Sequence, residues 1–224
     1  MLFKQNFARL CNGYGSYSFT FDRTFNTVGT FTVTITAIDK NGETDSKKAT
    51  ITVTAGDTYS DISSFSARLL YAPLVSGVQA CALATATGAT YTQAGAKANA
   101  SAIDILYFYG ATANASFGCP ADALTTAYPD LPTWSVRNAT QFATTSVAFA
   151  DVTTAAALQT AFDNGTLSTN GTVGNNDGRI YNLSTNQVVA FKTAAGKAGI
   201  LKVTEINPGS GTGNFIKIDV KVQK

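Results

Sequence analysis

Hydrophobic and polar residues alternate with a period of two near the start of the chain, most clearly from Gly29 to Ala55. This period is typical of a β-strand with one buried side and one solvent-facing side. The run Asp39-Lys40-Asn41-Gly42 interrupts it, and Asn-Gly is a favoured pair in tight hairpin loops. The segment therefore predicts a β-hairpin whose apolar face carries Phe31, Val33, Ile35, Ala37, Ala49, Ile51 and Val53.

The same alternation begins earlier, because serine and threonine separate Tyr17, Phe19 and Phe21. The stretch from Tyr14 to Phe21 therefore predicts a third strand that shares the apolar face of the hairpin. Residues 1–13 show no such period and are expected to form an irregular lead-in.

Four features follow one another along this part of the chain: an aromatic strand, a Val-Gly-Thr-Phe-Thr-Val-Thr strand entry, an Ile-Asp-Lys-Asn-Gly turn and a Thr-Ile-Thr-Val ending. This order resembles the last strands of PKD-like and related bacterial immunoglobulin-like domains. The resemblance covers residues 14–55 and implies a partial immunoglobulin-like β-sandwich unit. A complete sandwich has about seven strands in roughly 100 residues, so the early strands are missing. Truncation is the favoured explanation. A reduced module that packs on the next domain, or strands supplied by another chain, are the alternatives.

A short polar link from Gly56 to Asp61 marks the expected boundary between a unit at residues 14–56 and a second domain at residues 57–224. Strand and helix patterns mix beyond this link, which predicts an α+β domain with a mostly antiparallel sheet and two or three short helices. The fold class predicted for the whole chain is therefore mainly β.

The second domain holds several periodic segments. Thr153 or Thr154 is a suitable N-cap for one of the helices, and Leu158 and Phe162 lie four residues apart on its core face. The last three strands are separated by loops rich in turn formers, which favours an antiparallel meander. The expected helices are residues 92–102, 121–127 and 155–164. The expected strands are 62–76, with Phe65, Ala67, Leu69 and Tyr71 on one face, 103–110, 187–193, 199–206 and 214–222.

Charged residues make up only 13% of the chain and the net charge is +2, so neutral polar side chains must cover the surface. Such surfaces are usual outside cells. Without a basic run, nucleic acid is not an expected partner. The absence of an apolar run of 18 residues predicts no transmembrane helix. The N-terminus lacks the apolar region of a secretory signal, so export information is expected to have been removed or to lie outside this fragment.

Four strings in the second domain resemble uncharacterised surface proteins of the Bacteroidota: KANASAIDILYFYG, WSVRNAT, VVAFKTAAGKAGILKVTEI and IKIDVKV. In those proteins, a region of this kind often follows an immunoglobulin-like or PKD-like module. The resemblance implies an exported, cell-surface or extracellular protein and brings no known catalytic residues with it.

Histidine is absent from the chain, which excludes histidine-ligated metals and histidine-based nucleophile systems. Cysteine chemistry is limited by an odd count of three. Cys81 and Cys119 lie in the same domain and are candidates for a disulfide in an oxidising compartment, with Cys11 left over. Buried free thiols are an equally good interpretation, since cysteine packs as a small hydrophobe.

One candidate metal site and one candidate acid site stand out. Asp39, Asn41, Glu43 and Asp45 place oxygen ligands for Ca²⁺ in the hairpin turn, although an ordinary turn is favoured and no other cofactor is expected. Asp104 lies in an apolar strand, where a carboxylate needs a donor or a raised pKa. Glycoside hydrolysis needs a second carboxylate, such as Asp122 or Asp151. A bond from Asp104 to a neighbouring loop or to Arg137 is the favoured interpretation.

Flat amphipathic rings suit both sugar stacking and the rim of a core. Tyr107, Tyr109, Tyr128 and Trp134 are therefore candidates for a ligand platform, with Trp134 the best placed because Pro132 puts it in a loop. We expect a non-catalytic extracellular or cell-surface module for display, adhesion or contact with a surface glycan or protein. The alternatives are a self-assembling subunit, completed as a homo-oligomer by strand donation, and a carbohydrate-active enzyme that uses Asp104.

Overall fold

The computed structural model describes residues 2–10, 16–24, 27, 29–38, 41–53, 61–73, 78–174 and 176–224, with the backbone alone described for 2–10 and 16–24. The chain divides into two compact units, Met1–Ser60 and Asp61–Lys224. The boundary between them lies close to the domain boundary expected at the polar link. The protein is mainly β with a few short helices, which confirms the expected class. None of the described helices is both long and apolar enough to cross a membrane.

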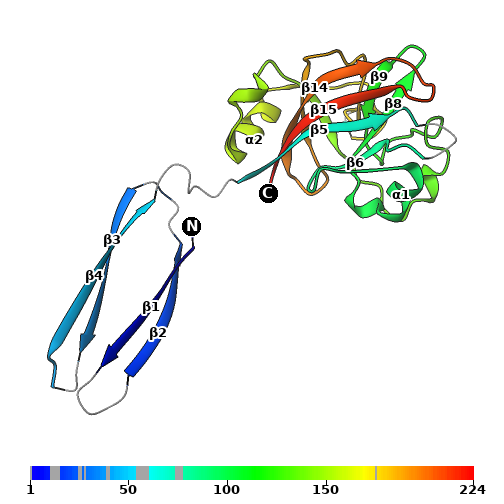
Figure 1. The fold of residues 1–224 in the computed structure, drawn as a ribbon. Coiled ribbons are helices and arrows are strands. Elements are labelled where there is room, and N and C mark those ends of the chain that lie inside the picture. The colour runs from blue at the N-terminus through cyan, green and yellow to red at the C-terminus, as the bar shows by residue number, and fades with distance from the viewer. Residues whose placement is uncertain are drawn as a thin grey trace. The chain divides into compact units, whose positions relative to one another are not determined.

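The first unit contains two antiparallel hairpins, β1 (Leu2–Leu10) with β2 (Ser16–Thr24) and β3 (Gly29–Ile38) with β4 (Thr44–Val53) (Figure 1). The β3–β4 hairpin follows the predicted alternation over most of its length, with Phe31, Val33, Ile35, Ala49, Ile51 and Val53 partly or fully buried between exposed threonines. Ala37 was placed on the same apolar face but is exposed, as is the neighbouring Ile38 near the end of β3. Phe31 lies opposite Ile51, and Val33 lies opposite Ala49.

The expected irregular lead-in at residues 1–13 is corrected by the structure, which has strand β1 there. The expected third strand is present as β2, but it pairs with β1 and not with the predicted hairpin. The sequence of β1, LFKQNFARL, does not alternate, so a search for a period of two misses it. Segment β1 is a strand because its backbone pairs with β2, and this pairing depends on both segments and not on the sequence of β1 alone.

The described residues of the second unit form two antiparallel sheets. Six strands pair in the order β11-β10-β13-β14-β15-β5 and five in the order β12-β9-β8-β6-β7. The strands of the first sheet are β5 (Ile62–Tyr71), β10 (Gln141–Thr144), β11 (Thr166–Leu167), β13 (Val188–Lys192), β14 (Ala198–Asn207) and β15 (Phe215–Gln223). Those of the second are β6 (Ala82–Ala84), β7 (Ala89–Tyr91), β8 (Ile105–Gly110), β9 (Asn114–Gly118) and β12 (Arg179–Ile180).

The main core brings inward-facing residues of both sheets together, including Leu83 and Ile105 of one sheet and Phe142, Phe191 and Leu201 of the other. Strand β8 is central and buried on both faces, as its unbroken apolar run predicts. Its alternate residues therefore belong to different clusters. Ile105 and Tyr107 contribute to the main core, and Leu106 and Phe108 to a second cluster.

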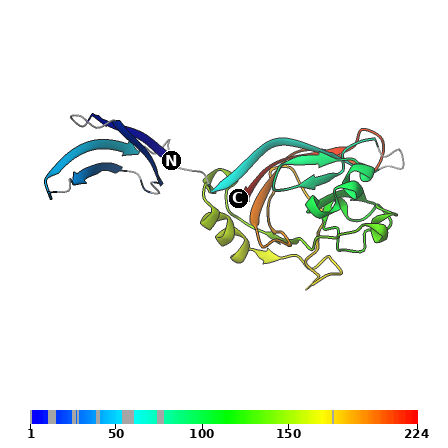
Figure 2. The same ribbon diagram turned by 90° about the horizontal axis from the view of Figure 1, so that it is seen from below.

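Two short helices cover the outer faces. α1 (Gln93–Ala98) and the loop at residues 119–134 pack over the second cluster, and α2 (Ala155–Asp163) packs over the outer face of the larger sheet. Figure 2 shows the two helices on opposite sides of the unit. The predicted cap of α2 is confirmed, because the Thr154 hydroxyl accepts a hydrogen bond from the Ala157 backbone N–H at 3.2 Å. Leu158 and Phe162 are buried as expected.

The closing meander β13-β14-β15 is confirmed, and Ile216, Ile218, Val220 and Val222 alternate as buried residues along β15. The helix that the sequence predicts at residues 121–127 is absent, and the chain forms turns there. Short 3-10 helices occur nearby and elsewhere, at Ala100–Ala102, Leu131–Thr133 and Phe149–Asp151.

A β-bulge in β5 reverses part of the predicted face. Arg68 pairs with Ile218 and Phe65 with Val220, so two residues of β5 oppose the single residue Asp219. Ala67 has a φ of 55°, and its N–H donates to the Asp219 carboxylate at 2.8 Å. Because an extra residue inverts the alternation, Leu70 and Ala72 enter the core after the bulge in place of the expected Leu69 and Tyr71.

Candidate functional site

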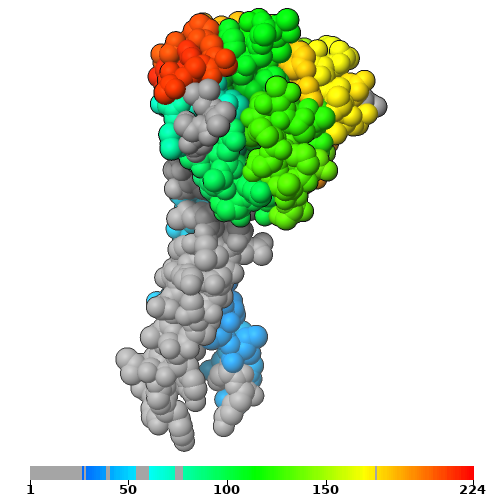
Figure 3. Space-filling view, turned by 90° about the vertical axis from the view of Figure 1, so that its right-hand side faces the viewer, coloured from blue at the N-terminus to red at the C-terminus, as the bar shows by residue number. Residues whose placement is uncertain are grey.

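A cavity of about 380 Å³ lies in the second unit where several connecting segments meet. The end of β8 contributes Phe108 and Tyr109, and the loop after β9 contributes Leu124 and Thr126. Strand β12 and the β14–β15 loop add Arg179 and Ser210. Figure 3 shows this loop (orange) beside the turn that follows β8 (green). We call this cavity the loop-end pocket.

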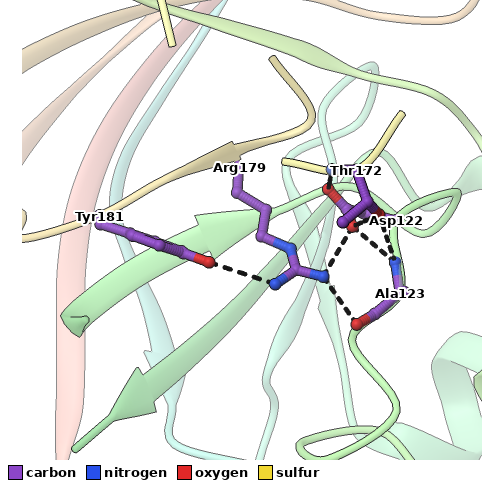
Figure 4. A network of polar contacts seen from close by, with 5 residues as sticks. All are labelled: Asp122, Ala123, Thr172, Arg179 and Tyr181. Atoms are coloured by element: carbon purple, nitrogen blue, oxygen red, sulfur yellow. Dashed lines mark hydrogen bonds and ion pairs between the residues drawn. The ribbon is translucent and has the colours of Figure 1, made fainter. Parts of the chain in front are cut away.

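Among the described residues that line the loop-end pocket, Arg179 is the cationic side chain, and its position is fixed by several acceptors. Its Nη2 atom donates to Asp122 Oδ1 and to the Ala123 carbonyl, both at 2.7 Å. Its Nη1 atom donates to the Tyr181 hydroxyl at 3.2 Å. Figure 4 shows the guanidinium lying between Tyr181 and Asp122. The side chain keeps only 15% of its surface exposed, so the geometry of its donors is preset.

Asp122 has a fully buried side chain and accepts hydrogen bonds from two segments that are distant in sequence. Besides Arg179, its donors are the backbone N–H of Thr172 at 3.0 Å, the Thr172 hydroxyl, and the backbone N–H of Ala123 at 2.6 Å. Burial acts to raise the pKa of Asp122, but the hydrogen bonds from Thr172 and Arg179 outweigh it and hold the pKa below its ordinary value. The carboxylate is therefore ionised and fully engaged at neutral pH.

Small residues make room for this buried carboxylate. A Cβ atom added at Gly171 would lie 2.7 Å from Asp122 Oδ2, and one added at Gly178 would lie 2.9 Å from the same atom. Both distances are shorter than a side chain tolerates. The glycines of the polar loop thus allow its backbone to approach Asp122 closely.

Aromatic rings form part of the pocket wall. Phe108 packs edge to face against Tyr181, with ring centroids 6.1 Å apart and an interplanar angle of 90°. Tyr109 is half-buried, and its hydroxyl donates to Asn114 Oδ1 at 3.4 Å. The pocket therefore combines apolar ring surface with fixed polar groups, which is the usual composition of a small-molecule site.

The predicted aromatic platform is not formed by the four expected residues. Tyr107 is buried in the main core, while Tyr128 and Trp134 are buried in the second cluster on the other face of the smaller sheet. The Tyr128 hydroxyl bonds to the Tyr107 carbonyl at 2.6 Å and to the Cys81 carbonyl at 3.0 Å. Of the four, Tyr109 alone lines the loop-end pocket. The others pack as core because both faces of this sheet are covered.

Asp104 makes the local hydrogen bonds that the favoured interpretation expects, but it lies one residue before β8 and not within the strand, and it is only partly buried. Its Oδ2 atom accepts from the Thr85 hydroxyl at 2.6 Å and from the Thr85 N–H at 3.0 Å, while Arg137 is exposed. Burial raises the pKa of Asp104 despite these two hydrogen bonds. The suggested partners have other environments, since Asp122 is engaged by Arg179 and Asp151 is exposed in a 3-10 helix. Asp104 also lines a separate cavity of about 210 Å³.

The proposed disulfide is not present. Cys81 and Cys119 are both free and buried, and they belong to different clusters. Burial raises the pKa of each thiol to about 11, so both are protonated and unreactive at neutral pH. Cys11 lies outside the described residues.

The suggested calcium turn falls partly outside the described residues, because Asp39 is not among them. Asn41, Glu43 and Asp45 are exposed at the end of the β3–β4 hairpin. Within the described part of the chain, no group of three or more acidic, cysteine or histidine residues is arranged to hold a metal ion.

The Arg179–Asp122–Thr172 network was not predicted from the sequence. Arg179 and Asp122 lie 57 residues apart, and neither belongs to a periodic pattern. The available signal was weak: an arginine directly after a loop rich in glycine and asparagine, in a chain with few charges. Comparison with protein-family models, with curated protein sequences and with solved structures finds no match. The function must therefore be inferred from the geometry of the site.

Proposed function

We propose that this chain is a non-catalytic extracellular or cell-surface module that contacts glycans through the loop-end pocket. The observation that carries the proposal is the combination of the Phe108 and Tyr109 rings with the fixed guanidinium of Arg179 around one cavity of about 380 Å³. Pockets of this size and composition bind small molecules.

A saccharide fits this chemistry because a sugar ring has apolar C–H faces and a rim of hydroxyl groups. Tyr109 supplies ring surface, while Thr126, Ser210 and Arg179 supply polar groups around it. The low fraction of charged residues, 13%, supports an extracellular location. The fixed acids support a role in binding instead of catalysis, since Asp104 and Asp122 both accept hydrogen bonds within the fold.

A glycan array followed by calorimetry with the best ligands tests this proposal. Tyr109→Ala is expected to weaken binding about tenfold, or about 1.4 kcal/mol, because it removes ring surface from the pocket wall. Tyr91→Ala is the matched control, since Tyr91 is also a half-buried tyrosine packed on a core cluster but does not line the pocket. The proposal fails if the folded wild type binds no saccharide.

Self-assembly is a second candidate, favoured by the first unit. There, β1–β2 and β3–β4 are separate two-stranded sheets among the described residues, and an isolated pair of strands is marginal in water. Strands from a neighbouring chain would extend such sheets. Size-exclusion chromatography with light scattering tests this candidate. A concentration-dependent oligomer supports it, and a strict monomer up to millimolar concentration removes it.

A further inference from the structure

The charge of the loop-end pocket points to the class of saccharide it accepts. Arg179 is the one charged residue among the described residues that line the pocket. Taken alone, an arginine in a cavity suggests an acidic ligand, because its guanidinium matches a carboxylate. The surroundings of Arg179 argue against that simple interpretation.

The positive charge of Arg179 is already neutralised inside the protein. Asp122 lies 2.7 Å from Nη2, has no exposed side-chain surface and is held ionised by its low pKa. Both N–H groups of Nη2 have acceptors, Asp122 and the Ala123 carbonyl. Arg179 therefore lines the pocket with the Asp122 carboxylate buried behind it, the pair has no net charge, and the field of the carboxylate largely cancels that of the guanidinium.

An acidic ligand would have to leave water without finding an uncompensated cation. Desolvation of a carboxylate is costly, and a guanidinium that already has a close counter-ion offers little in return. A neutral hydroxyl group has a much smaller desolvation penalty, and single hydrogen bonds with fixed donors or acceptors offset it. Nη1 of Arg179 has Tyr181 as its one acceptor among the described residues, so one N–H remains for such a bond.

We infer that the loop-end pocket selects neutral saccharides and rejects uronic and sialic acids. This inference rests on the proposed glycan contact and adds the substrate class. A cavity of about 380 Å³ lies near the lower end of the range for ligand pockets, which suits one or two sugar rings.

Paired ligands test the inference on the full, unmodified chain. Neutral disaccharides and their counterparts oxidised to a uronic acid at one ring differ chiefly in one carboxylate. Calorimetry with wild-type protein is expected to show at least tenfold weaker binding of each acidic member. The dissociation constant of the neutral member should change less than twofold between 50 and 500 mM NaCl, because no net charge is involved.

Equal or tighter binding of the acidic member, with strong salt dependence, would overturn the inference and leave glycan contact standing. If neither member binds, and no other saccharide on the array binds, both proposals are removed.

The variant Asp122→Asn provides a second test, because it keeps an acceptor oxygen near Arg179 but removes the negative charge. If near-ultraviolet circular dichroism shows that this variant is folded, its affinity for acidic saccharides should rise about tenfold. No increase in a folded variant contradicts the neutralisation argument.

Discussion

At the scale of single residues, Asp104 shows how a partly buried acid can weaken a fold. Because burial raises its pKa, the folded state binds a proton more tightly than the unfolded state does. Its contribution to stability therefore falls as pH rises from the unfolded value of about 3.9 through the raised folded pKa. Above that window, the ionised carboxylate keeps its hydrogen bonds to Thr85 but also carries a cost of partial desolvation.

Asp104→Asn is accordingly expected to stabilise the protein at pH 8 by about 1 kcal/mol or less, since the amide oxygen still accepts from Thr85 without a charge to desolvate. At pH 3 the difference should vanish or change sign. Urea unfolding at both pH values measures it, with the exposed Asp151→Asn as the control for loss of one negative charge. The Asp104→Asn variant also tests the alternative that the protein is a carbohydrate-active enzyme. If the wild type hydrolyses a glycoside and the variant does not, catalysis by Asp104 is favoured.

Asp122 shows the opposite behaviour. Its pKa is lowered, so its stabilising contribution is present above the unfolded pKa and is lost as pH falls through the folded pKa. Asp122→Ala is expected to lower the free energy of unfolding at pH 7 by about 3–5 kcal/mol, because it leaves Arg179 without its buried counter-ion. Denaturant unfolding measures this loss.

The double variant Asp122→Ala/Arg179→Met distinguishes a damaged ion pair from a damaged loop. Since removal of both partners leaves no uncompensated charge, it should recover part of the stability lost in Asp122→Ala alone. Additive losses in the double-mutant cycle would mean that the two residues stabilise the fold independently.

At the scale of secondary-structure elements, the bulge in β5 is the clearest local constraint. Ala67 has a left-handed φ of 55°, which costs an L-residue roughly 1 kcal/mol, and its N–H donates to Asp219. Ala67→Gly is therefore expected to raise the free energy of unfolding by about 0.5–1 kcal/mol, and Ala67→Val to lower it by more. Thermal unfolding measures both changes. Ser66→Gly, one residue earlier, should destabilise. If Ser66→Gly also stabilised the protein, the effect of Ala67→Gly could not be assigned to the left-handed φ of Ala67.

The elements predicted correctly from the sequence share one property: local pattern and tertiary environment agree. In β15, each alternate residue faces the core, and α2 has a cap, a core face and a stop. The bulge in β5 breaks this agreement, because it depends on Asp219 of a strand about 150 residues away in sequence. Strand β1 lacks a pattern altogether. Periodicity therefore identifies regular, amphipathic elements and misses those defined by their partners.

The candidate site was harder to predict for the same reason. Tyr109 could be singled out because an aromatic ring at the end of an apolar strand is a visible feature, but three of the four aromatic candidates proved to be core. Both faces of the smaller sheet are buried, and a sequence does not show that a second layer covers a strand. Arg179 and Asp122 come together only when β12 pairs with β9 and the polar loop folds over Asp122.

At the scale of the whole molecule, the two units differ in the arrangement of their described strands. The second unit buries three clusters of hydrophobic residues around two sheets, whereas the described strands of the first unit form two-stranded sheets. Because each unit has most of its contacts within itself, the second is expected to fold without the first. A fragment of residues 61–224 should therefore unfold cooperatively, with a midpoint within about 3 °C of the main transition of the full chain.

Differential scanning calorimetry of the full chain and the fragment provides the measurement. The full chain should show an additional transition at lower temperature, because each described sheet of the first unit has only two strands, and a two-stranded sheet is marginally stable in water. Glycan affinity should be equal in the two proteins, since the described residues that line the loop-end pocket all belong to the second unit. A fragment that melts more than about 5 °C lower would show that the units stabilise each other. A folded fragment that loses glycan binding would place part of the binding site in the first unit.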